Sequence, residues 1–300
     1  MVSIIMLVYN HEKFIDEALK GIISQNTSFP FELIIANDQS SDSSELIIQK
    51  YRDKFPHIVK GFYNQENLGI GLNFEKALRF AKSKYIALCE GDDYWTDENK
   101  LQKQVDFLEA NNGYTICFHK VQVLDNNKLS NCAITEERYD SIKERPISTK
   151  HLLEAGNFIH TPSVVFRNMN LDLPFEFLHS TVGDYFLYII LSKYGHIKRL
   201  DDVMAVYRRG VGIFSSLDSM AMQKQVLIYQ ACILSYLDNE EYKKIMLAKQ
   251  IALIKVNAEQ YQIALVDAIK VGSLQIAKLK IKTFLKRVFT EPSKTPNQVV

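Results

Sequence analysis

The sequence predicts an α/β protein with a Rossmann-like, mixed but mainly parallel sheet flanked by helices, followed by an all-helical region. In the first ninety residues, short β-rich runs alternate with segments of helical periodicity, which is the pattern of a parallel sheet covered by helices. Beyond residue 217 the apolar residues recur at helical spacing throughout. We therefore expect an α/β domain over residues 1–215 and a helical region over 216–300.

The period of the apolar residues defines the first strands and helices. Apolar side chains recur on one helical face over 12–24, and the polar run 40–44 supplies residues that cap helix starts. The expected strands are 3–9, 31–38, 58–64 and 85–90, and the expected helices are 12–24, a segment from about 45, and 73–82. Because parallel strands present their carboxyl ends at one edge, we expect a ligand beyond that edge.

The remainder of the chain shows weaker patterns. Residues 126–147 are polar and are expected to form a loop, and a helix that opens at Asp184 is expected to end before Gly195. Further strands are expected over 115–125, 163–166, 196–200 and 203–208, with a helix from about 97. The helical region is expected to contain segments 217–237, 240–257, 259–271 and 273–289.

Composition excludes several classes of protein. The chain has 36 basic and 35 acidic residues, so its net charge of +1 does not indicate a nucleic-acid binder. The four cysteines are widely spaced, which argues against a zinc site or a disulfide framework and favours the cytoplasm. No apolar run approaches the roughly 20 residues that a membrane span needs, so a membrane contact is expected to be peripheral.

The stretch "LCEGDDYW" places three carboxylates at the end of an apolar strand. Glu90, Asp92 and Asp93 repel one another at such short spacing, and a bound cation relieves that repulsion. Oxygen ligands of this kind suit Mg²⁺ or Mn²⁺, which commonly share their coordination sphere with phosphate oxygens. The chain has neither a complete glycine fingerprint nor a P-loop, so a carboxylate-held metal is the expected means of binding a nucleoside diphosphate.

Four blocks of the chain, taken in order, resemble the family 2 glycosyltransferases of the GT-A fold. The resemblance covers about residues 2–210 and rests on "VSIIMLVYNHEKFIDEALKGIISQ", "FELIIANDQSSDSS", "NLGIGLNFEKALRFAKSKYIALCEGDDYW" and "GDYFLYIILSKYG". It implies transfer of a sugar from a nucleotide-sugar to an acceptor hydroxyl, with inversion and a divalent cation. It also implies a setting in bacterial surface polysaccharide or glycoconjugate biosynthesis.

The resemblance also assigns roles to individual residues. Asp184 resembles the general base, although Asp is also a common residue at helix starts. Asp93 resembles the principal metal ligand, with Asp92 beside it. The residues expected to bind the donor nucleotide are Val8, Tyr9, Asn10, Asp38, Asn67 and Asp92. Asn37 and Glu90 stand where the family usually has Asp, which leaves the base preference and the role of Glu90 open.

Four further residues are candidates for acceptor or diphosphate contacts. His160 precedes a strand near the expected acceptor side, and a structural role is its alternative. Arg208 and Arg209 lie in "VYRRGVGIFS", which resembles a loop over the donor, but Gly210 replaces the family's usual His. Trp95, beside Tyr94, is a candidate for stacking on a sugar or a base, and a place in the core is its alternative.

The last helical segment is basic and amphipathic. Residues 273–289 are expected either to contact anionic lipid, which suits a lipid-linked acceptor, or to pack on the domain or on a second copy in a homo-oligomer. The expected partners are a nucleoside-diphosphate sugar, with UDP-sugars favoured, and a saccharide or lipid-linked acceptor, at the inner face of the membrane. The alternatives are a sugar nucleotidyltransferase and a non-catalytic relative that binds nucleotide-sugars or a partner.

Overall fold

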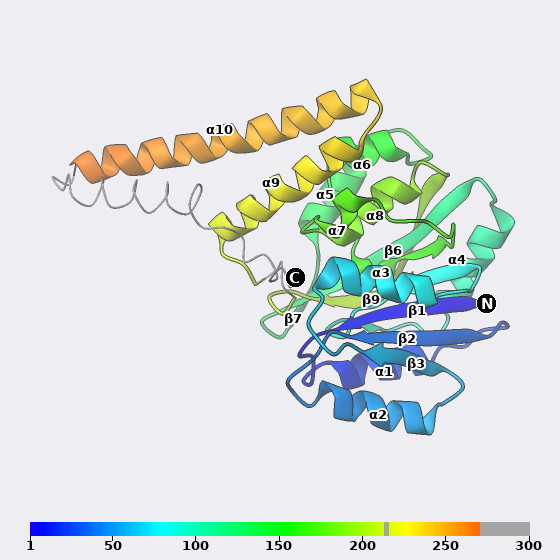
Figure 1. Cartoon of the computed structure of the whole chain (residues 1–300). Helices are drawn as coiled ribbons and strands as arrows, with labels where there is room; N and C mark the ends of the chain where they lie inside the picture. The colour runs from blue at the N-terminus through cyan, green and yellow to red at the C-terminus, as the bar shows by residue number, and fades with distance from the viewer. Residues whose placement is uncertain (213–215, 271–300) are drawn as a thin grey trace. The chain divides into compact units, whose positions relative to one another are not determined.

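The structure, a computed structural model, describes residues 1–212 and 216–270 (Figure 1). The chain divides into two compact units, Met1–Met246 and Leu247–Val300. The first unit contains the sheet and every site residue expected from the sequence. The segment 273–289, expected to contact lipid or a second copy, lies outside the described residues.

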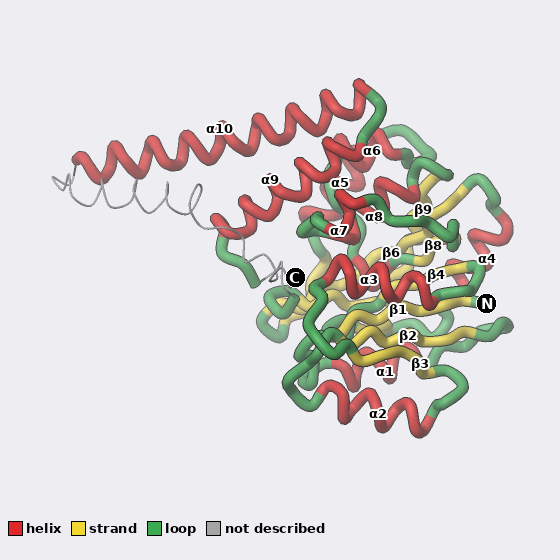
Figure 2. Tube along the Cα trace, in the orientation of Figure 1, coloured by secondary structure: helices red, strands yellow, loops and turns green. Residues whose placement is uncertain are grey.

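The sheet is mixed, as the sequence predicts, and its first four strands in spatial order are parallel. The order is β3-β2-β1-β4-β8-β6-β9-β5, with β7 paired to β6 (Figure 2). Strand β8 is antiparallel to both β4 and β6, β5 is antiparallel to β9, and β7 is antiparallel to β6. Strands β6 and β9 are parallel to each other. The strands are β1 Val2–Val8, β2 Phe31–Asn37, β3 Val59–Tyr63, β4 Tyr85–Leu88, β5 Tyr94–Trp95, β6 Tyr114–Asp125, β7 Lys128–Asn131, β8 Val165–Arg167 and β9 His196–Arg208.

Helices cover both faces of the sheet, and each face has its own apolar core. Figure 1 shows α1 and α2 on one side of the sheet and α3 on the other. The core on the first face includes side chains of α1, α2 and α4, and the core on the second includes side chains of α3, α6, α7 and α8. The central strand β1 is apolar at almost every position because both of its faces are buried. The helices are α1 Ile15–Ile23, α2 Ser44–Lys54, α3 Ile70–Phe80, α4 Lys100–Ala110, α5 Ala133–Ser141, α6 Thr149–Ala155, α7 Phe175–Leu178, α8 Gly183–Leu191, α9 Ser219–Tyr236 and α10 Glu240–Lys270.

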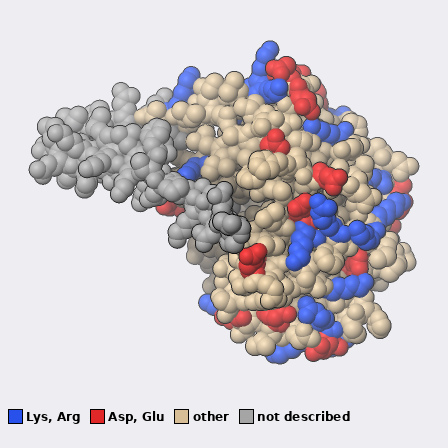
Figure 3. Space-filling view, in the orientation of Figure 1, with Lys and Arg blue, Asp and Glu red and all other residues tan. Residues whose placement is uncertain are grey.

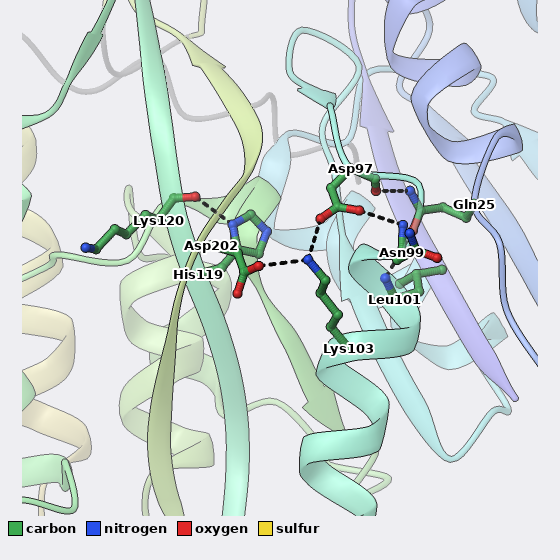
Figure 4. A network of polar contacts seen from close by, with 8 residues as sticks. All are labelled: Gln25, Asp97, Asn99, Leu101, Lys103, His119, Lys120 and Asp202. Atoms are coloured by element: carbon green, nitrogen blue, oxygen red, sulfur yellow. Dashed lines mark hydrogen bonds and ion pairs between the residues drawn. The ribbon is translucent and has the colours of Figure 1, made fainter.

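Strand β9 is continuous where the sequence predicted two strands. The register against β6 shifts between the pairs His119–Leu200 and Lys120–Val203, so Asp201 and Asp202 form a bulge. The Lys103 ammonium holds this bulge, donating to Asp202 (2.7 Å) and to Asp97 (2.8 Å) (Figure 4). The two acidic residues interrupt the apolar alternation without ending the strand.

A second polar contact in Figure 4 joins the loop before α4 to the end of α1. The Gln25 amide donates to the carbonyl of Asp97 (2.7 Å) and accepts from the backbone of Leu101 (3.0 Å). Together with Lys103, it fixes the segment between the acidic stretch "EGDD" and α4. The start of α4 is thereby tied to the end of α1 and to β9.

Three further expectations about the elements are wrong. Residues 126–147 contain β7 and α5 rather than a loop alone, because a turn at Asn126 and Asn127, both at positive φ, folds β7 back onto β6. Helix α8 ends at Leu191 with Ser192 as its C-cap, so Gly195 does not terminate it. Helix α10 continues through the expected break near residue 258.

The expected domain boundary at 215/216 stays a prediction. Helix α9 and the start of α10 belong to the first unit, since Ile233, Leu237 and Met246 are buried in the core that also contains α8. Among the described residues, no helix is both long enough and apolar enough to span a bilayer. On the face drawn in Figure 3, acidic and basic side chains are interspersed, in agreement with a net charge of +1.

Candidate active site

The parallel strands bring three polar segments together at one edge of the sheet. Val8 is in register with Asn37, and β4 runs parallel to β1 on its other side. The turns that follow β1, β2 and β4 therefore meet at this edge, and they carry Asn10, Asp38 and the acidic stretch. This is the crevice in which the sequence predicts a ligand.

Glu90, Asp92 and Asp93 form the acidic cluster, the one group in the described residues with the geometry of a metal site. One ligand atom from each lies within 4.8 Å of the others. Asp92 and Asp93 are buried, and Oδ1 of Asp92 and Oδ2 of Asp93 have no hydrogen-bond partner among the described residues. Unpaired buried carboxylate oxygens are costly, so their positions fit a divalent cation as the missing partner.

The electrostatics of the acidic cluster support the same conclusion. Burial, followed by the Asp92 charge, raises the pKa of Asp93 well above its usual range. Burial raises the pKa of Glu90 to about 8, with further contributions from Asp92 and Asp184. A cation bound to these oxygens reverses the repulsion and favours the ionised carboxylates. The sequence left the role of Glu90 open, and the structure places it beside Asp92, facing Asp184.

Asp184 lies in the first turn of α8 and is buried near the acidic cluster, since its charge acts on Glu90. Its Oδ1 accepts from the backbone amide of Tyr185 (2.6 Å), and its Oδ2 accepts from Asn157 and Thr161 (both 3.3 Å). Glu90 and Asp184 line the same cavity. Burial raises the pKa of Asp184, while these hydrogen bonds stabilise the ionised form and oppose the shift. Asp184 is therefore a fixed carboxylate that faces the acidic cluster.

His160 lies on the Asp184 side of the site. Its ring packs against Tyr207 with centroids 4.8 Å apart, and its Nε2 is buried without a hydrogen-bond partner among the residues described. Burial lowers the pKa of His160 to about 4, against the opposing effect of Asp184. The ring is therefore neutral at physiological pH, and its contact with acceptor or diphosphate stays a prediction.

The two arginines after β9 have different environments. The buried guanidinium of Arg208 donates to the carbonyl of Asp92 (2.6 Å), pairs with Glu17 and lies over the rings of Phe14 and Tyr94. It supports the acidic cluster from within the protein, so the structure does not present it as a free phosphate ligand. Arg209 is exposed, 3.5 Å from Asp125.

Trp95 lies in the core, the alternative to stacking on a sugar or a base. Its ring is 3% exposed and lies in the core on the α1 side of the sheet. The indole nitrogen donates to the carbonyl of Pro162 (2.9 Å), and the ammonium of Lys100 lies 4.1 Å from the ring centroid. An aromatic residue after a strand fits a core position as readily as a binding site, and here the core alternative holds.

Asp38 holds the loop that precedes α3. Its Oδ1 accepts from Asn64 (2.8 Å) and from the amide of Leu68 (2.9 Å), and its Oδ2 accepts from the amide of Gly69 (2.9 Å). The side chain of Asn67 donates to the Asp38 carbonyl (3.1 Å). Asp38 and Asn67 therefore shape this wall of the crevice, and their contacts with a donor stay predictions.

The turn after β1 also borders the crevice. Val8 is buried, whereas Tyr9 is 44% exposed. Asn10 has positive φ and its side chain accepts from the backbone of Ser41 (2.8 Å), so it joins the turns after β1 and β2. These three residues lie at the edge where the sequence places the nucleoside.

Sequence reasoning missed two residues of the site. The ring of His11 lies against Gly91, where an added Cβ would meet its Nδ1 at 2.7 Å. Burial lowers the pKa of His11, against the opposing effect of the Asp92 charge. The hydroxyl of Tyr188 is buried near Asp184 and Glu90, whose charges add to burial in raising its pKa. Tyr188 follows Asp184 by four residues on α8, so helical spacing from a candidate base is the signal that would have found it.

The arrangement is a GT-A fold with a carboxylate-rich edge. The mannosyltransferase PcManGT from Pyrobaculum calidifontis, solved in complex with GDP-Man and Mn²⁺, has a similar structure with a TM-score of 0.62. The likeness covers 96% of this chain and 81% of that chain at 17% sequence identity, so it shows a shared fold. The sequence matches the family described as Glycosyl transferase family 2 over residues 3–170, and the chain belongs to that family.

Two curated relatives each match about two thirds of the chain. Rv1520 of Mycobacterium tuberculosis, an uncharacterized protein, is 39% identical over 209 residues, 69% of this chain and 58% of its own length. The chain thus spans under two thirds of that relative. The Escherichia coli UDP-Glc:alpha-D-GlcNAc-diphosphoundecaprenol beta-1,3-glucosyltransferase WfgD is 25% identical over 67% of this chain and 73% of its own.

Proposed function

We propose that the chain is a metal-dependent, inverting glycosyltransferase that transfers a sugar from a nucleoside-diphosphate sugar to an acceptor hydroxyl in surface polysaccharide or glycoconjugate assembly. The observation that carries this proposal is the cavity that Glu90 of the acidic cluster and Asp184 both line. A metal-held leaving group and a base need to stand on opposite sides of the reacting carbon, and the site has a candidate for each.

The residues divide between binding and proton transfer. Asp93 and Asp92 would hold Mn²⁺ or Mg²⁺, since each has a buried carboxylate oxygen without a hydrogen-bond partner among the described residues. When bound, the cation stabilises the negative charge that develops on the leaving diphosphate. Asp184 accepts the proton of the acceptor hydroxyl, and its hydrogen bonds from Tyr185, Asn157 and Thr161 keep the carboxylate oriented.

Relatives support the identity of the substrates. WfgD is named for a UDP-glucose donor and a diphosphoundecaprenol-linked acceptor, and PcManGT was solved with GDP-Man and Mn²⁺. We propose a UDP-sugar donor and a saccharide or lipid-linked acceptor, used at the inner face of the membrane. A helical region over 216–300 would then serve acceptor, membrane or homo-oligomer contacts.

A thermal-shift assay tests the metal and the nucleotide together. UDP and GDP are each added with Mn²⁺, with Mg²⁺ and with EDTA, and the melting temperature is followed. We expect a rise with one of the nucleoside diphosphates when a cation is present and none in EDTA, because the acidic cluster repels a bare pyrophosphate.

Two variants sharpen the assay. Asp93→Asn removes the buried ligand and is expected to abolish the metal-dependent rise, whereas Asp53→Asn, which changes an exposed aspartate on α2, is expected to retain it. Stabilisation of equal size in EDTA, or none with any nucleoside diphosphate, would show that the acidic cluster is not a nucleotide–metal site.

A further inference from the structure

The cavity between the acidic cluster and α8 is small and mainly apolar. Its volume is about 40 Å³, and apart from Glu90, Thr161 and Asp184 its lining residues are apolar or glycine. Its walls include Leu7 of β1 and Leu187 of α8. Since one water needs roughly 10–15 Å³ on this measure, the space admits a methyl-sized group and excludes a whole sugar ring.

The position of this cavity indicates which reactant faces it. In an in-line displacement, the leaving diphosphate and the attacking hydroxyl lie on opposite sides of the transferred sugar. Glu90 belongs to the cluster assigned to the diphosphate, and Asp184 is assigned to the attacking hydroxyl. The cavity that both residues border therefore faces the transferred sugar, an inference that rests on the proposed function.

The walls favour an apolar substituent over a hydroxyl. Phe74 and Phe177 lie with ring centroids 5.9 Å apart, and both line the cavity with Leu88. Moving a methyl group from water to such walls is favourable in free energy, whereas a hydroxyl group buried there loses its hydrogen bonds to water at a cost in free energy. We propose that the cavity binds a methyl group of the transferred sugar, so that the donor is a nucleoside-diphosphate 6-deoxy sugar or N-acetyl sugar.

Gly183 and Ile70 are the positions at which the cavity can be altered with least disturbance. A Cβ added at Gly183 would lie 3.5 Å from Cζ of Phe177, an ordinary contact distance, so alanine fits there but narrows the space. Ile70 lines the cavity from the start of α3 and is 42% exposed, so serine at that position is compatible with folding.

Binding of paired nucleotide-sugars to the full chain tests the proposal. With Mn²⁺ present, calorimetry compares UDP-N-acetylglucosamine with UDP-glucose, and compares GDP-mannose and dTDP-glucose each with its 6-deoxy form. UDP, GDP and dTDP are measured alongside. We expect the methyl-bearing member of at least one pair to bind about ten-fold more tightly, as for one added methyl in an apolar pocket. A preference seen only between UDP-N-acetylglucosamine and UDP-glucose identifies the acetyl methyl as the group that enters the cavity. A preference seen only between a donor and its 6-deoxy form identifies the methyl at C6.

Matched variants test whether the preference for the methyl-bearing nucleotide-sugar arises in this cavity. Gly183→Ala and Ile70→Ser are each expected to reduce the affinity ratio between the two nucleotide-sugars of a pair at least three-fold. Gly113→Ala has open space for its Cβ, and Leu72→Ser changes a residue 44% exposed on the same helix as Ile70. These two controls lie outside the cavity and are expected to retain the preference.

The outcomes separate this inference from the function on which it rests. Equal affinity within every pair, together with metal-dependent binding of a nucleoside diphosphate, leaves the glycosyltransferase proposal standing and overturns the methyl pocket. The methyl pocket is also overturned if Gly183→Ala and Gly113→Ala alter the preference equally. Failure of every nucleoside diphosphate to bind with Mn²⁺ or Mg²⁺ overturns both proposals.

Discussion

The backbone amide of Arg208 donates a hydrogen bond of 2.8 Å to Oδ1 of Asp93. This contact satisfies one carboxylate oxygen, and Oδ2 has no hydrogen-bond partner among the described residues, as the proposed cation site requires. The end of β9 thereby orients the proposed metal ligand Asp93, which follows β4 and lies 115 residues earlier in the chain. The guanidinium of the same arginine holds the carbonyl of Asp92, so one residue positions both buried members of the acidic cluster.

Replacing Arg208 is expected to weaken the acidic cluster. Arg208→Met leaves the carbonyl of Asp92 unpaired, so we expect the free energy of unfolding, measured in urea, to fall by about 1–3 kcal/mol. Arg209→Met is the control, because Arg209 is exposed, and it should change stability by less than about 0.5 kcal/mol. If Arg208→Met instead retains stability and loses only nucleotide affinity, its guanidinium is a phosphate ligand, as the sequence suggested.

Asp38 is expected to act through the loop that it holds. In Asp38→Asn the amide group cannot accept from all of the amides of Leu68 and Gly69 and the side chain of Asn64, so the loop should loosen. We expect faster hydrogen exchange at Leu68 and Gly69 together with weaker nucleotide binding. Weaker binding with unchanged exchange would contradict this and point to a direct contact between Asp38 and the donor.

The sequence predicted those parts of the fold that have a clear period. Strands β1, β2 and β4 are buried on both faces and read as apolar runs, and the edge where they end was correctly expected to hold the acidic cluster. The bulge at Asp201 and Asp202 could not be predicted, because a break in alternation looks the same whether a strand bends or ends.

The environments of Trp95 and Arg208 could not be predicted from the sequence for a different reason. Both depend on contacts between segments far apart in the chain. The partner of Trp95 is Pro162, and the partners of Arg208 are Asp92 and Glu17. Residue type alone marks a tryptophan or an arginine as a candidate contact without saying which surface it faces.

Lys100 is expected to make stability depend on pH. It is fully buried, and burial lowers its pKa to about 7, whereas a lysine in an unfolded chain titrates near ~10.4. Between these values the unfolded chain binds more protons, so this residue makes the free energy of unfolding rise with pH. Below pH 7 the side chain is a buried ammonium, and its full desolvation cost lowers the free energy of unfolding.

Lys100→Met removes that pH dependence. The variant also takes a donor from Gln104, so we expect a net gain of about 1–3 kcal/mol over the wild type near pH 6, shrinking as the pH approaches 10. Urea unfolding across this range, with Lys13→Met as an exposed control, measures the difference. A constant difference between variant and wild type at every pH would show that Lys100 does not titrate in the folded protein.

Asp184 is expected to carry proton transfer and to leave donor binding unchanged. Asp184→Asn keeps the size of the side chain but cannot accept the proton, so kcat should fall by about 10²–10⁴-fold while metal-dependent binding of the nucleoside diphosphate persists. Nucleotide release with the identified donor and acceptor measures the first quantity, and calorimetry measures the second. Unchanged turnover would remove Asp184 from the role of base.

The pH dependence of transfer distinguishes a base from a structural carboxylate at the start of α8. Burial raises the pKa of Asp184, so kcat/KM should fall on acidification at a pH above the usual carboxylate value of ~3.9. Asn157→Ala removes a donor to the ionised form, which raises that pKa further and should move the acidic limb to higher pH. Asn112→Ala, at an exposed position, should leave the limb in place. If Asn157→Ala lowers kcat/KM equally at every pH, Asn157 supports only the structure of the site. The acidic limb then does not report the pKa of Asp184, which contradicts its role as the base.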